Sequence, residues 1–463
     1  MDKEPRLTSK PNESLEAAIQ RVGNPVDLLR NMPGRAYSHG VVDAQFTNWQ
    51  SEVQAWRKAC AFLDQSHHMI DLYVRGPDAH ALLASLGVNS FENFGPGMAK
   101  QFVAPSPDGF YLGDCVLFYL EDNLFNLVGR RTVLDWVEFN VASGKWNVTT
   151  ERDPQTQDRG GRPPVVYRYE VQGPLAVALM QKATGKPVPE VKFFGMTEFQ
   201  IAGKRVRALR HGMAGEVGFE MFGPWEEGDA VRDAILKAGE EFGLLRVGSL
   251  AYSSANLESG WIPGPLPAIF SQGSLKAYRE WLPSRAGGIL AGSLYTKDIE
   301  DYYVTPYDLG YGRLIKFDHD FVGAAALQEH AKAPQRRKVT LVWDPQDMAR
   351  VVSSMWSEGP KYKYFNLPKA RYGLYQMDEV LKDGKRVGIS MDCGYLANER
   401  VVVSLAVVDE SHASPGTTVT VMWGEEPNSA KPQVEAHVQT KIQATVAPAP
   451  YGVHARTTYR KSA

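Results

Sequence analysis

QRRKVTLVW, residues 335–343, is the stretch at which this 463-residue chain changes character. Before it, strand-like and helical patterns alternate, whereas after it the chain is mostly strand-like. Its VTLVW run (339–343) returns in similar form as VTVMW at 419–423. Two similar strands in one β domain explain this similarity better than a true repeat does. The sequence therefore predicts an α+β part over residues 1–335 and a β-barrel domain over residues 336–463.

Upstream of this boundary, short apolar runs of strand-like composition alternate with helical patterns. Strands are expected at 70–74, 116–120, 124–128, 165–171 and 206–210, and helices at 79–87, 132–140 and 226–243. In the segment 44–64, four apolar side chains recur at the spacing of a helix: Trp49, Val53, Trp56 and Cys60. They are therefore expected to share one buried face, which would make Cys60 a core thiol.

Composition and charge are those of an ordinary globular protein. Hydrophobic residues make up 43% and charged residues 22% of the chain, and the formal net charge is -2. The basic stripe of a nucleic-acid-binding protein is absent from the sequence, and so is an apolar run of the roughly 18 residues that a membrane span needs. The first residues lack the apolar core of a signal peptide. Cys60, Cys115 and Cys393 are far apart, which indicates a reducing cytoplasm without a disulfide framework.

LDQSHHMIDLYVRG, residues 63–76, places two adjacent histidines at the head of an apolar strand. Neighbouring side chains on a strand point to opposite faces, so His67 and His68 can rarely bind one ion. No HExxH, CxxC or HxH motif accompanies them, and a metal site is not expected. One histidine should face a cavity while the other packs or meets solvent. Spacing alone does not show which histidine faces the cavity. Gln65 and His67 would point to the same side only if the strand already begins at Gln65.

GMAGEVGFEMFGP, residues 212–224, lies between two predicted strands of a hairpin and lacks the lysine and the helix of a phosphate-binding loop. Glu220 shares a strand face with Phe222, and the opposite face is also apolar. A carboxylate in such a dry place needs partners. Two interpretations stay open at this point. Glu220 forms a buried ion pair with Arg207 or Arg210 across the hairpin, or it accepts two parallel N–H bonds from a heterocycle.

LFNLVGRRTVLDW, residues 124–136, predicts a strand, a glycine turn and the start of a helix. Arg130 and Arg131 stand where the free N–H groups of the helix terminus point, which is a natural anion site. An arginine there could hold a carboxylate in a bidentate pair. Two solvated surface arginines are the alternative. A GxSxG motif, a Ser/His/Asp arrangement and a dinucleotide fingerprint are all absent from the sequence.

Four stretches follow one another in the order seen in the glycine-cleavage T-protein family, which this chain resembles over most of its length. They are VQGPLA (171–176), GEVGFEMFGP (215–224), GSLAYSSANLESGW (248–261) and PYDLGYGRLIKFDHDFVGAAAL (306–327). The resemblance is closest to the tetrahydrofolate-dependent aryl-ether O-demethylases, which act on lignin-derived aromatic acids. AWRKACAFLDQSHHMIDLYVRG, LESGWIPGPLPAI, KAYREWLP and IEDYYVTPY carry it. It implies a T-protein-like three-domain cloverleaf with two intertwined subdomains in residues 1–335.

Two departures from the T-protein pattern count against aminomethyl transfer. The T-protein carries a paired Asp-Asp where this chain reads Asp114-Cys115, and its Arg-Asp pair becomes Tyr252-Ser253 here. A further relative binds folate without catalysis and is linked to iron–sulfur repair. Its KGCYxGQE hallmark is missing from this sequence, so a non-catalytic folate-binding protein is the minor alternative.

The resemblance implies that a methyl group moves from an aryl ether oxygen to N5 of tetrahydrofolate, without a metal. Such a displacement gains much of its rate from positioning. The leaving aryloxide needs a proton, and a tyrosine with a pKa near 10 suits a phenol-like group. Tyr252 occupies the position that the resemblance gives to this donor. Syringate, which would give 3-O-methylgallate, is the expected substrate, because His39 replaces a bulkier tyrosine of vanillate-type relatives. Vanillate and 3-O-methylgallate are the alternatives.

The same resemblance assigns the remaining site residues. The pocket for the aromatic acid is implied to contain Tyr37, His39, Gln65, His68 and Arg130. The folate site is implied to contain Gln172, Phe193, Glu220, Tyr252 and Trp261. Tyr252 and His68 would be the catalytic pair, with His67 packed beside them, and Arg130 would hold the carboxylate. Glu220 would accept the pterin 2-amino and N3–H groups, and Phe194 is the alternative to Phe193. The expected partners are thus an aromatic acid and folate, with neither nucleic acid nor membrane.

Overall fold

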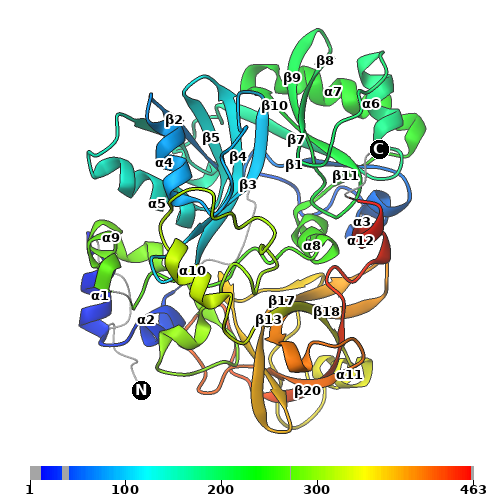
Figure 1. Ribbon diagram of the computed structural model, residues 1–463. Coiled ribbons are helices and arrows are strands. Elements are labelled where there is room, and N and C mark those ends of the chain that lie inside the picture. Colours follow the sequence, from blue (N-terminus) through cyan, green and yellow to red (C-terminus); the bar gives the residue numbers. More distant parts are fainter. Residues whose placement is uncertain (1–11, 34–40, 272, 460–463) are drawn as a thin grey trace.

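The computed structural model (Figure 1) describes residues 12–33, 41–271 and 273–459, so Tyr37 and His39 lie outside the described residues. Within these ranges, three large β-sheets and a two-stranded pair, β12 (Leu290–Ala291) with β15 (Tyr375–Gln376), carry the fold. The first two sheets lie side by side, and the third lies below both of them in Figure 1. The predicted mixture of helices and sheets is confirmed.

The first sheet is five-stranded and antiparallel, in the order β3-β4-β5-β2-β6. Its strands are β2 (Ile70–Arg75), β3 (Met98–Pro105), β4 (Tyr111–Glu121), β5 (Leu124–Gly129) and β6 (Thr149–Asp153). Two helices, α4 (Ala79–Leu86) and α5 (Arg131–Ala142), share its hydrophobic core through Leu82, Leu83 and Val133. The strands and helices predicted in this part of the sequence are confirmed.

The second sheet is six-stranded, in the order β11-β1-β7-β10-β9-β8. Its strands are β1 (Ala61–Asp64), β7 (Val166–Gln172), β8 (Met196–Ile201), β9 (Lys204–Arg210), β10 (Gly218–Pro224) and β11 (Leu245–Val247). On one face, Tyr169 and Val171 of β7 pack against α6 (Ala176–Thr184) and α7 (Gly228–Gly239). Because strand side chains alternate between faces, the polar residues of β7 point the other way, toward the first sheet.

The third sheet closes into an antiparallel barrel of six strands, because β18 pairs with both β13 and β17. These strands are β13 (Arg336–Trp343), β16 (Asp378–Lys382), β17 (Lys385–Leu396), β18 (Val401–Asp409), β19 (Thr418–Trp423) and β20 (Thr440–Ala447), and β14 (Lys369–Ala370) attaches to β17. The similar runs VTLVW and VTVMW lie on either side of β20. Their tryptophans, Trp343 and Trp423, meet inside the barrel with ring centroids 5.5 Å apart. The predicted barrel is thereby confirmed.

The other helices cover the sheets and connect them. They are α1 (Leu15–Val22), α2 (Pro25–Asn31), α3 (Trp49–Lys58), α8 (Ser249–Ser259), α9 (Lys276–Trp281), α10 (Ala324–His330), α11 (Pro345–Ser353) and α12 (Val453–Thr457). None of the helices in the described part of the chain is long and apolar enough to cross a membrane.

The prediction that Cys60 shares the buried face of the preceding helix is wrong. Helix α3 ends at Lys58, and Ala59 takes a non-helical conformation with φ -140° and ψ -107° that turns the chain into β1. Val53 and Trp56 remain in one cluster, whereas Cys60 packs in the core beneath α6 and α7. Cys60 is nevertheless the expected core thiol, since burial raises its pKa to about 12.

A buried ionic chain joins the first two sheets. Arg168 of β7 donates from Nη1 to Glu220 Oε1 at 2.9 Å and from Nη2 to Asp71 Oδ1 at 2.9 Å. Asn126 donates to the same Asp71 oxygen at 2.7 Å. Arg168 is 1% exposed and its guanidinium lies over the ring of Phe222, so its charge depends on these two carboxylates.

Replacing Arg168 by Met should lower the free energy of unfolding by about 3–5 kcal/mol, because two buried carboxylates would lose their cation. The matched control is Arg205→Met, which removes an exposed pair with Glu198 and should cost far less. Urea unfolding curves at neutral pH compare the two variants. Equal losses would show that Arg168 does not tie the sheets together.

Candidate functional site

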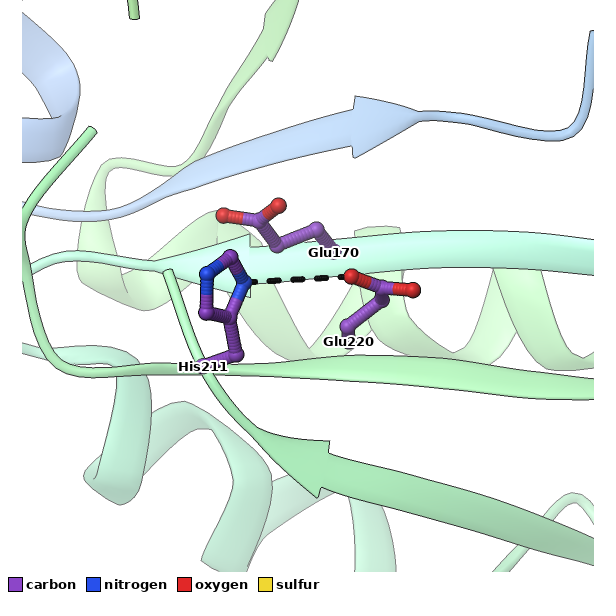
Figure 2. Close-up of side chains that lie close together, drawn as sticks. All are labelled: Glu170, His211 and Glu220. Atoms are coloured by element: carbon purple, nitrogen blue, oxygen red, sulfur yellow. Dashed lines mark ion pairs between the residues drawn. The ribbon is translucent and has the colours of Figure 1, made fainter. Parts of the chain in front are cut away.

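The polar face of the second sheet holds a pair of carboxylates. Glu170 of β7 and Glu220 of β10 are direct cross-strand neighbours, so their side chains stand next to each other. His211 follows β9 and turns its ring toward Glu220, as Figure 2 shows. One ligand atom from each of the three residues lies within 4.8 Å of the other two. We call these three residues the carboxylate cluster, and they form the first part of the candidate site.

Glu170 is fully buried and has a hydrogen bond on each oxygen. Its Oε1 accepts from the backbone N–H of Met213 at 2.8 Å, and its Oε2 accepts from the side-chain amide of Gln65. Burial, together with the charge of Glu220, raises the pKa of Glu170 to about 8. At neutral pH Glu170 is therefore mostly protonated, and the pair carries close to one negative charge.

Glu170 was not among the predicted site residues, although a signal for it exists in the sequence. In VYRYEVQ (166–172), Arg168, Glu170 and Gln172 alternate with apolar residues. Such alternation puts three polar side chains on one face of a single strand. His211 carries no comparable signal, because it lies beyond the end of β9 in a turn.

Of the two interpretations left open for Glu220, the ion pair with Arg207 or Arg210 is wrong. Arg207 pairs with Glu121 at 3.0 Å, and Arg210 lies opposite Phe219 and so points to the other face of β10. The partner of Glu220 is Arg168, which comes from the neighbouring strand on the opposite side of β10. One Glu220 oxygen is thus engaged, and the other, Oε2, lies 3.8 Å from His211 Nδ1.

The cluster has the residue types of a cation site. No sequence motif marks it, because its three members come from separate segments of the chain. Its hydrogen bonding is less suited to a cation. Glu220 already faces the guanidinium of Arg168, and both oxygens of Glu170 accept N–H groups. Glu170 is a neutral acid, and Glu220 is a carboxylate with one oxygen bonded by Arg168. The other oxygen of Glu220 can accept N–H groups of a heterocycle.

Tyr252 and His68 form the second element of the site. Tyr252 Oη and His68 Nε2 share a hydrogen bond of 2.9 Å, and their rings meet edge to face with centroids 4.9 Å apart. Tyr252 lies in the first turn of α8, whose start is held by the N–H of Gly248 donating to the buried Glu52 at 2.8 Å. A small hollow surrounds the pair, lined by Val42, Leu63, Asp64, Val247 and Ser249.

The two histidines lie in a turn between β1 and β2 instead of on a strand, so strand parity does not apply to them. His68 faces Tyr252. His67 packs on the other side, where its Nδ1 lies 2.9 Å from Thr156 Oγ1 and its ring meets that of Trp225. Burial lowers the pKa of His67. The structure therefore places His68 in the hollow and His67 behind it.

Gln65 lies in the same β1–β2 connection as His68 and contacts the carboxylate pair. It is 1% exposed and donates its Nε2 hydrogen to Glu170. Its Oε1 has no hydrogen-bond partner within the described part of the chain. Gln172, two residues beyond Glu170, has the complementary pattern. Its Oε1 accepts from Ala214 N at 2.9 Å, and its buried Nε2 lacks a partner among the same residues. Buried polar atoms left in this state point to a missing ligand.

The two arginines at the start of α5 differ. Arg131 forms an ion pair with Asp135 at 2.9 Å on the helix surface. Arg130 is the N-cap residue, and its buried Nη1 has no hydrogen-bond partner in the described ranges. An added Cβ on Gly264 would stand 3.4 Å from this nitrogen, so the glycine leaves space beside it. Arg130 thus offers an unused donor at a helix N-terminus.

Trp261 belongs to a hydrogen-bonded group centred on Asp114. Its Nε1 donates to Asp114 Oδ2 at 3.2 Å, and Tyr311 donates to the same oxygen at 2.6 Å. Tyr111 reaches Asp114 Oδ1 at 2.6 Å, and Gln101 adds a fourth donor at 2.7 Å. The indole edge of Trp261 is therefore engaged, and its orientation is fixed by a buried carboxylate.

The adjacent phenylalanines have different surroundings. Phe194 packs between the first two sheets with Leu209 and Phe222. Phe193 is half-buried, and its ring lies edge to face on Tyr459 with centroids 5.0 Å apart. Both rings border the carboxylate cluster, since the centroid of Phe194 lies 5.4 Å and that of Phe193 lies 6.2 Å from the ring of His211.

Known proteins resemble this chain along nearly its full length. The model of the GCVT N-terminal domain family matches residues 30–263. Syringate O-demethylase from Sphingobium sp. strain SYK-6 is 47% identical over 97% of this chain and 98% of its own length. Sesamin methylene transferase from Sinomonas sp. strain No.22 is 30% identical over 87% of this chain and 90% of its own.

A solved structure has the same fold. The glycine cleavage system aminomethyltransferase T from Bartonella henselae superimposes with a TM-score of 0.59 at 18% identity, covering 96% of this chain and 98% of that one. This likeness confirms the T-protein-like fold that the sequence motifs implied. Together with the family match and the near full-length relatives, it shows that the chain belongs to the GCVT family, the family of the glycine-cleavage T-protein.

Proposed function

We propose that this protein is a tetrahydrofolate-dependent O-demethylase, which moves a methyl group from a methoxybenzoate to N5 of tetrahydrofolate. The observation that carries the proposal is the hydrogen-bonded pair of Tyr252 and His68. His68 and Gln65 belong to the same short connection between β1 and β2, so one segment holds both the partner of the phenolic proton donor and the amide that bonds Glu170. Similarity to syringate O-demethylase supports syringate as the substrate and 3-O-methylgallate as the product.

The residues around the carboxylate cluster suit a reduced pterin. Glu220 Oε2 can accept N–H groups of the ring, while Arg168 holds the other oxygen. The unpaired Nε2 of Gln172 can donate to an acceptor on the pterin edge. Phe193 and Trp261 can supply apolar walls for the flat faces of the ligand. With Glu170 mostly protonated, the site presents the single carboxylate that two pterin N–H groups need.

The proposed reaction breaks the bond between the methyl carbon and the aryl oxygen and forms a bond between that carbon and N5. The aryloxide takes a proton from Tyr252, N5 releases its own proton to solvent, and the Tyr252 phenolate regains a proton through His68, so the enzyme ends the cycle unchanged. The hydrogen bond to His68 fixes the direction of the Tyr252 hydroxyl. Such general-acid help, added to alignment of the reacting atoms, accounts for catalysis without a redox step.

The aromatic acid is proposed to bind between Arg130 and the Tyr252 hollow. The unused Nη1 donor of Arg130 suits the substrate carboxylate. Gln65 and His68 would line the ring, and Tyr37 and His39 are assigned to this pocket by resemblance alone. We expect no metal, because Arg168 already supplies the positive charge beside Glu220.

We also propose a division of labour between residues 1–335, which bind folate and substrate, and residues 336–463, which support them. Lys369 of β14 donates to Asn256 Oδ1 at 2.7 Å and to Asp392 of β17. Asn256 lies on α8, one turn beyond Tyr252. The barrel therefore holds the helix that carries the proposed proton donor. All three cysteines are buried and free of disulfides, which suits the cytoplasm that we propose as its location.

The direct test of the function is product analysis. Pure protein is incubated in EDTA-containing buffer with tetrahydrofolate and, in parallel, syringate, vanillate or 3-O-methylgallate. We expect 5-methyltetrahydrofolate by mass, with syringate consumed fastest. Folate binding without any methylated product would instead identify a binding protein, and activity that EDTA abolishes would contradict the metal-free mechanism.

Tyr252→Phe should retain folate and substrate binding and lose about 100-fold or more in kcat, since it removes the proposed general acid. Tyr395→Phe is the control, because this tyrosine packs in the same hydrophobic cluster. Steady-state rates with syringate decide the matter. Turnover within a few-fold of wild type would remove Tyr252 from the catalytic role.

Two further variants should separate the two binding sites. Glu220→Gln should weaken tetrahydrofolate by roughly ten-fold or more, because a charge-assisted acceptor becomes partly a donor. Arg130→Ala should weaken syringate and leave folate affinity unchanged, whereas the neighbouring Arg131→Ala should affect neither. Calorimetric titrations of both ligands measure this crossed pattern. Parallel losses in both ligands would mean that the residues are structural.

His39→Tyr should shift the preference from syringate toward vanillate by about ten-fold, since a bulkier ring would crowd the second methoxy group. The two substrates compete in one reaction, and the ratio of their kcat/KM values is read from the products. An unchanged ratio would show that His39 does not select the substrate.

A further inference from the structure

After the last barrel strand, the chain returns to the second sheet. Strand β20 ends at Ala447, and α12 then lies beside α3 and α8 (Figure 1). We name residues Gly452–Tyr459 the closing segment. Its last residue, Tyr459, follows the last strand by twelve residues and is nevertheless only 5% exposed.

Tyr459 contacts His211 of the carboxylate cluster and three residues near it. Its backbone oxygen accepts from Arg210 Nη1 at 3.4 Å, and its hydroxyl accepts from the N–H of Gly212 at 3.4 Å. Its ring lies 5.0 Å from that of Phe193 and 6.4 Å from that of His211. Tyr459 therefore touches both an aromatic ring beside the cluster and the imidazole that faces Glu220.

The closing segment is anchored by a contact between an imidazole and a carboxylate. His454 Nε2 lies 2.8 Å from Glu216 Oε1, and Arg57 of α3 lies 3.1 Å from the same carboxylate oxygen. Ala455 packs against Gly215 so closely that a Cβ on this glycine would stand 3.0 Å from the alanine methyl. The glycine's φ of +74° adds a second reason against a side chain there.

The loop that the closing segment covers is the one that organises the site. Between β9 and β10, Met213 donates its N–H to Glu170, and Ala214 donates its N–H to Gln172. His454 and Ala455 clamp this loop from outside, through Glu216 and Gly215. A displacement of the segment would thus reach two residues of the proposed pterin site through their backbone partners.

We propose that the closing segment completes the folate-binding site and that Tyr459 is a positioning residue, which holds Phe193 and His211 against the pterin. The inference rests on the proposed function. It concerns the folate side alone, because the contacts of Tyr459 lie on the segment before β8, on β9 and on the loop after β9, whereas the Tyr252–His68 pair belongs to α8 and the β1–β2 turn. Pre-ordering these side chains lowers the cost of binding.

The first test separates a positioning role from a general structural one. Tyr459→Ala should weaken tetrahydrofolate by about ten-fold and raise its KM, while syringate affinity and kcat at saturating folate stay within about two-fold of wild type. Tyr459→Phe keeps the ring and should restore folate affinity. Trp356→Ala, at a 73% exposed aromatic residue beyond α11, is the control. Unchanged folate affinity in Tyr459→Ala, or equal weakening of both ligands, would overturn the inference.

The second test uses the unaltered protein and does not depend on a variant that folds. Arg456 of the closing segment is exposed, as is Lys385 in the barrel. Tetrahydrofolate should slow tryptic cleavage after Arg456 by about ten-fold and leave cleavage after Lys385 unchanged. Equal cleavage after Arg456 with and without bound folate would overturn the inference. If the wild type does not bind tetrahydrofolate in calorimetry, the proposed function itself fails, which is a separate result.

Discussion

The guanidinium of Arg168 is the constraint on which both the fold and the site depend. It is buried between two sheets and bonds a carboxylate from each, Asp71 and Glu220. A buried cation of this kind is stable only with its partners, so the two sheets must stay in one relative position. The same bond leaves one oxygen of Glu220 for a ligand. A structural tie thereby determines which hydrogen bonds the proposed folate site can offer.

The charge of the site follows from this arrangement. Arg168 forms ion pairs with both Asp71 and Glu220. Glu170, which lies on the same strand as Arg168, has no cation bonded to it in the described part of the chain. Burial and the negative charge of Glu220 therefore raise the pKa of Glu170 to about 8, so that Glu170 is mostly protonated at neutral pH. Neutral and charged acids placed next to each other are a common way to set different roles for chemically similar groups. Here the result is a buried polar cluster in which the side chains of Gln65 and Gln172 each keep one unsatisfied atom among the described residues.

The barrel and the closing segment support the candidate site through different elements. Lys369 and Asp392 bond Asn256 on α8, and this helix carries Tyr252 toward His68. The closing segment instead presses on the loop between β9 and β10, through His454 at Glu216. The proposed proton donor and the proposed pterin site are thus supported by different parts of the chain. This separation is the reason that variants at each support are expected to affect different ligands.

The sequence by itself determined the family, the barrel and most strands and helices, because local periodicity and motif order are properties of the chain itself. It also pointed to Tyr252, Glu220 and the arginine that caps α5. Only the tertiary structure decided the partners. Strand β10 lies between β7 and β9, so Glu220 meets Arg168 instead of Arg207, and it brings Glu170 and His211 into one cluster. Alternation along a strand shows which face a side chain takes, but the order of strands in a sheet, which sets its neighbours, comes from contacts distant in sequence.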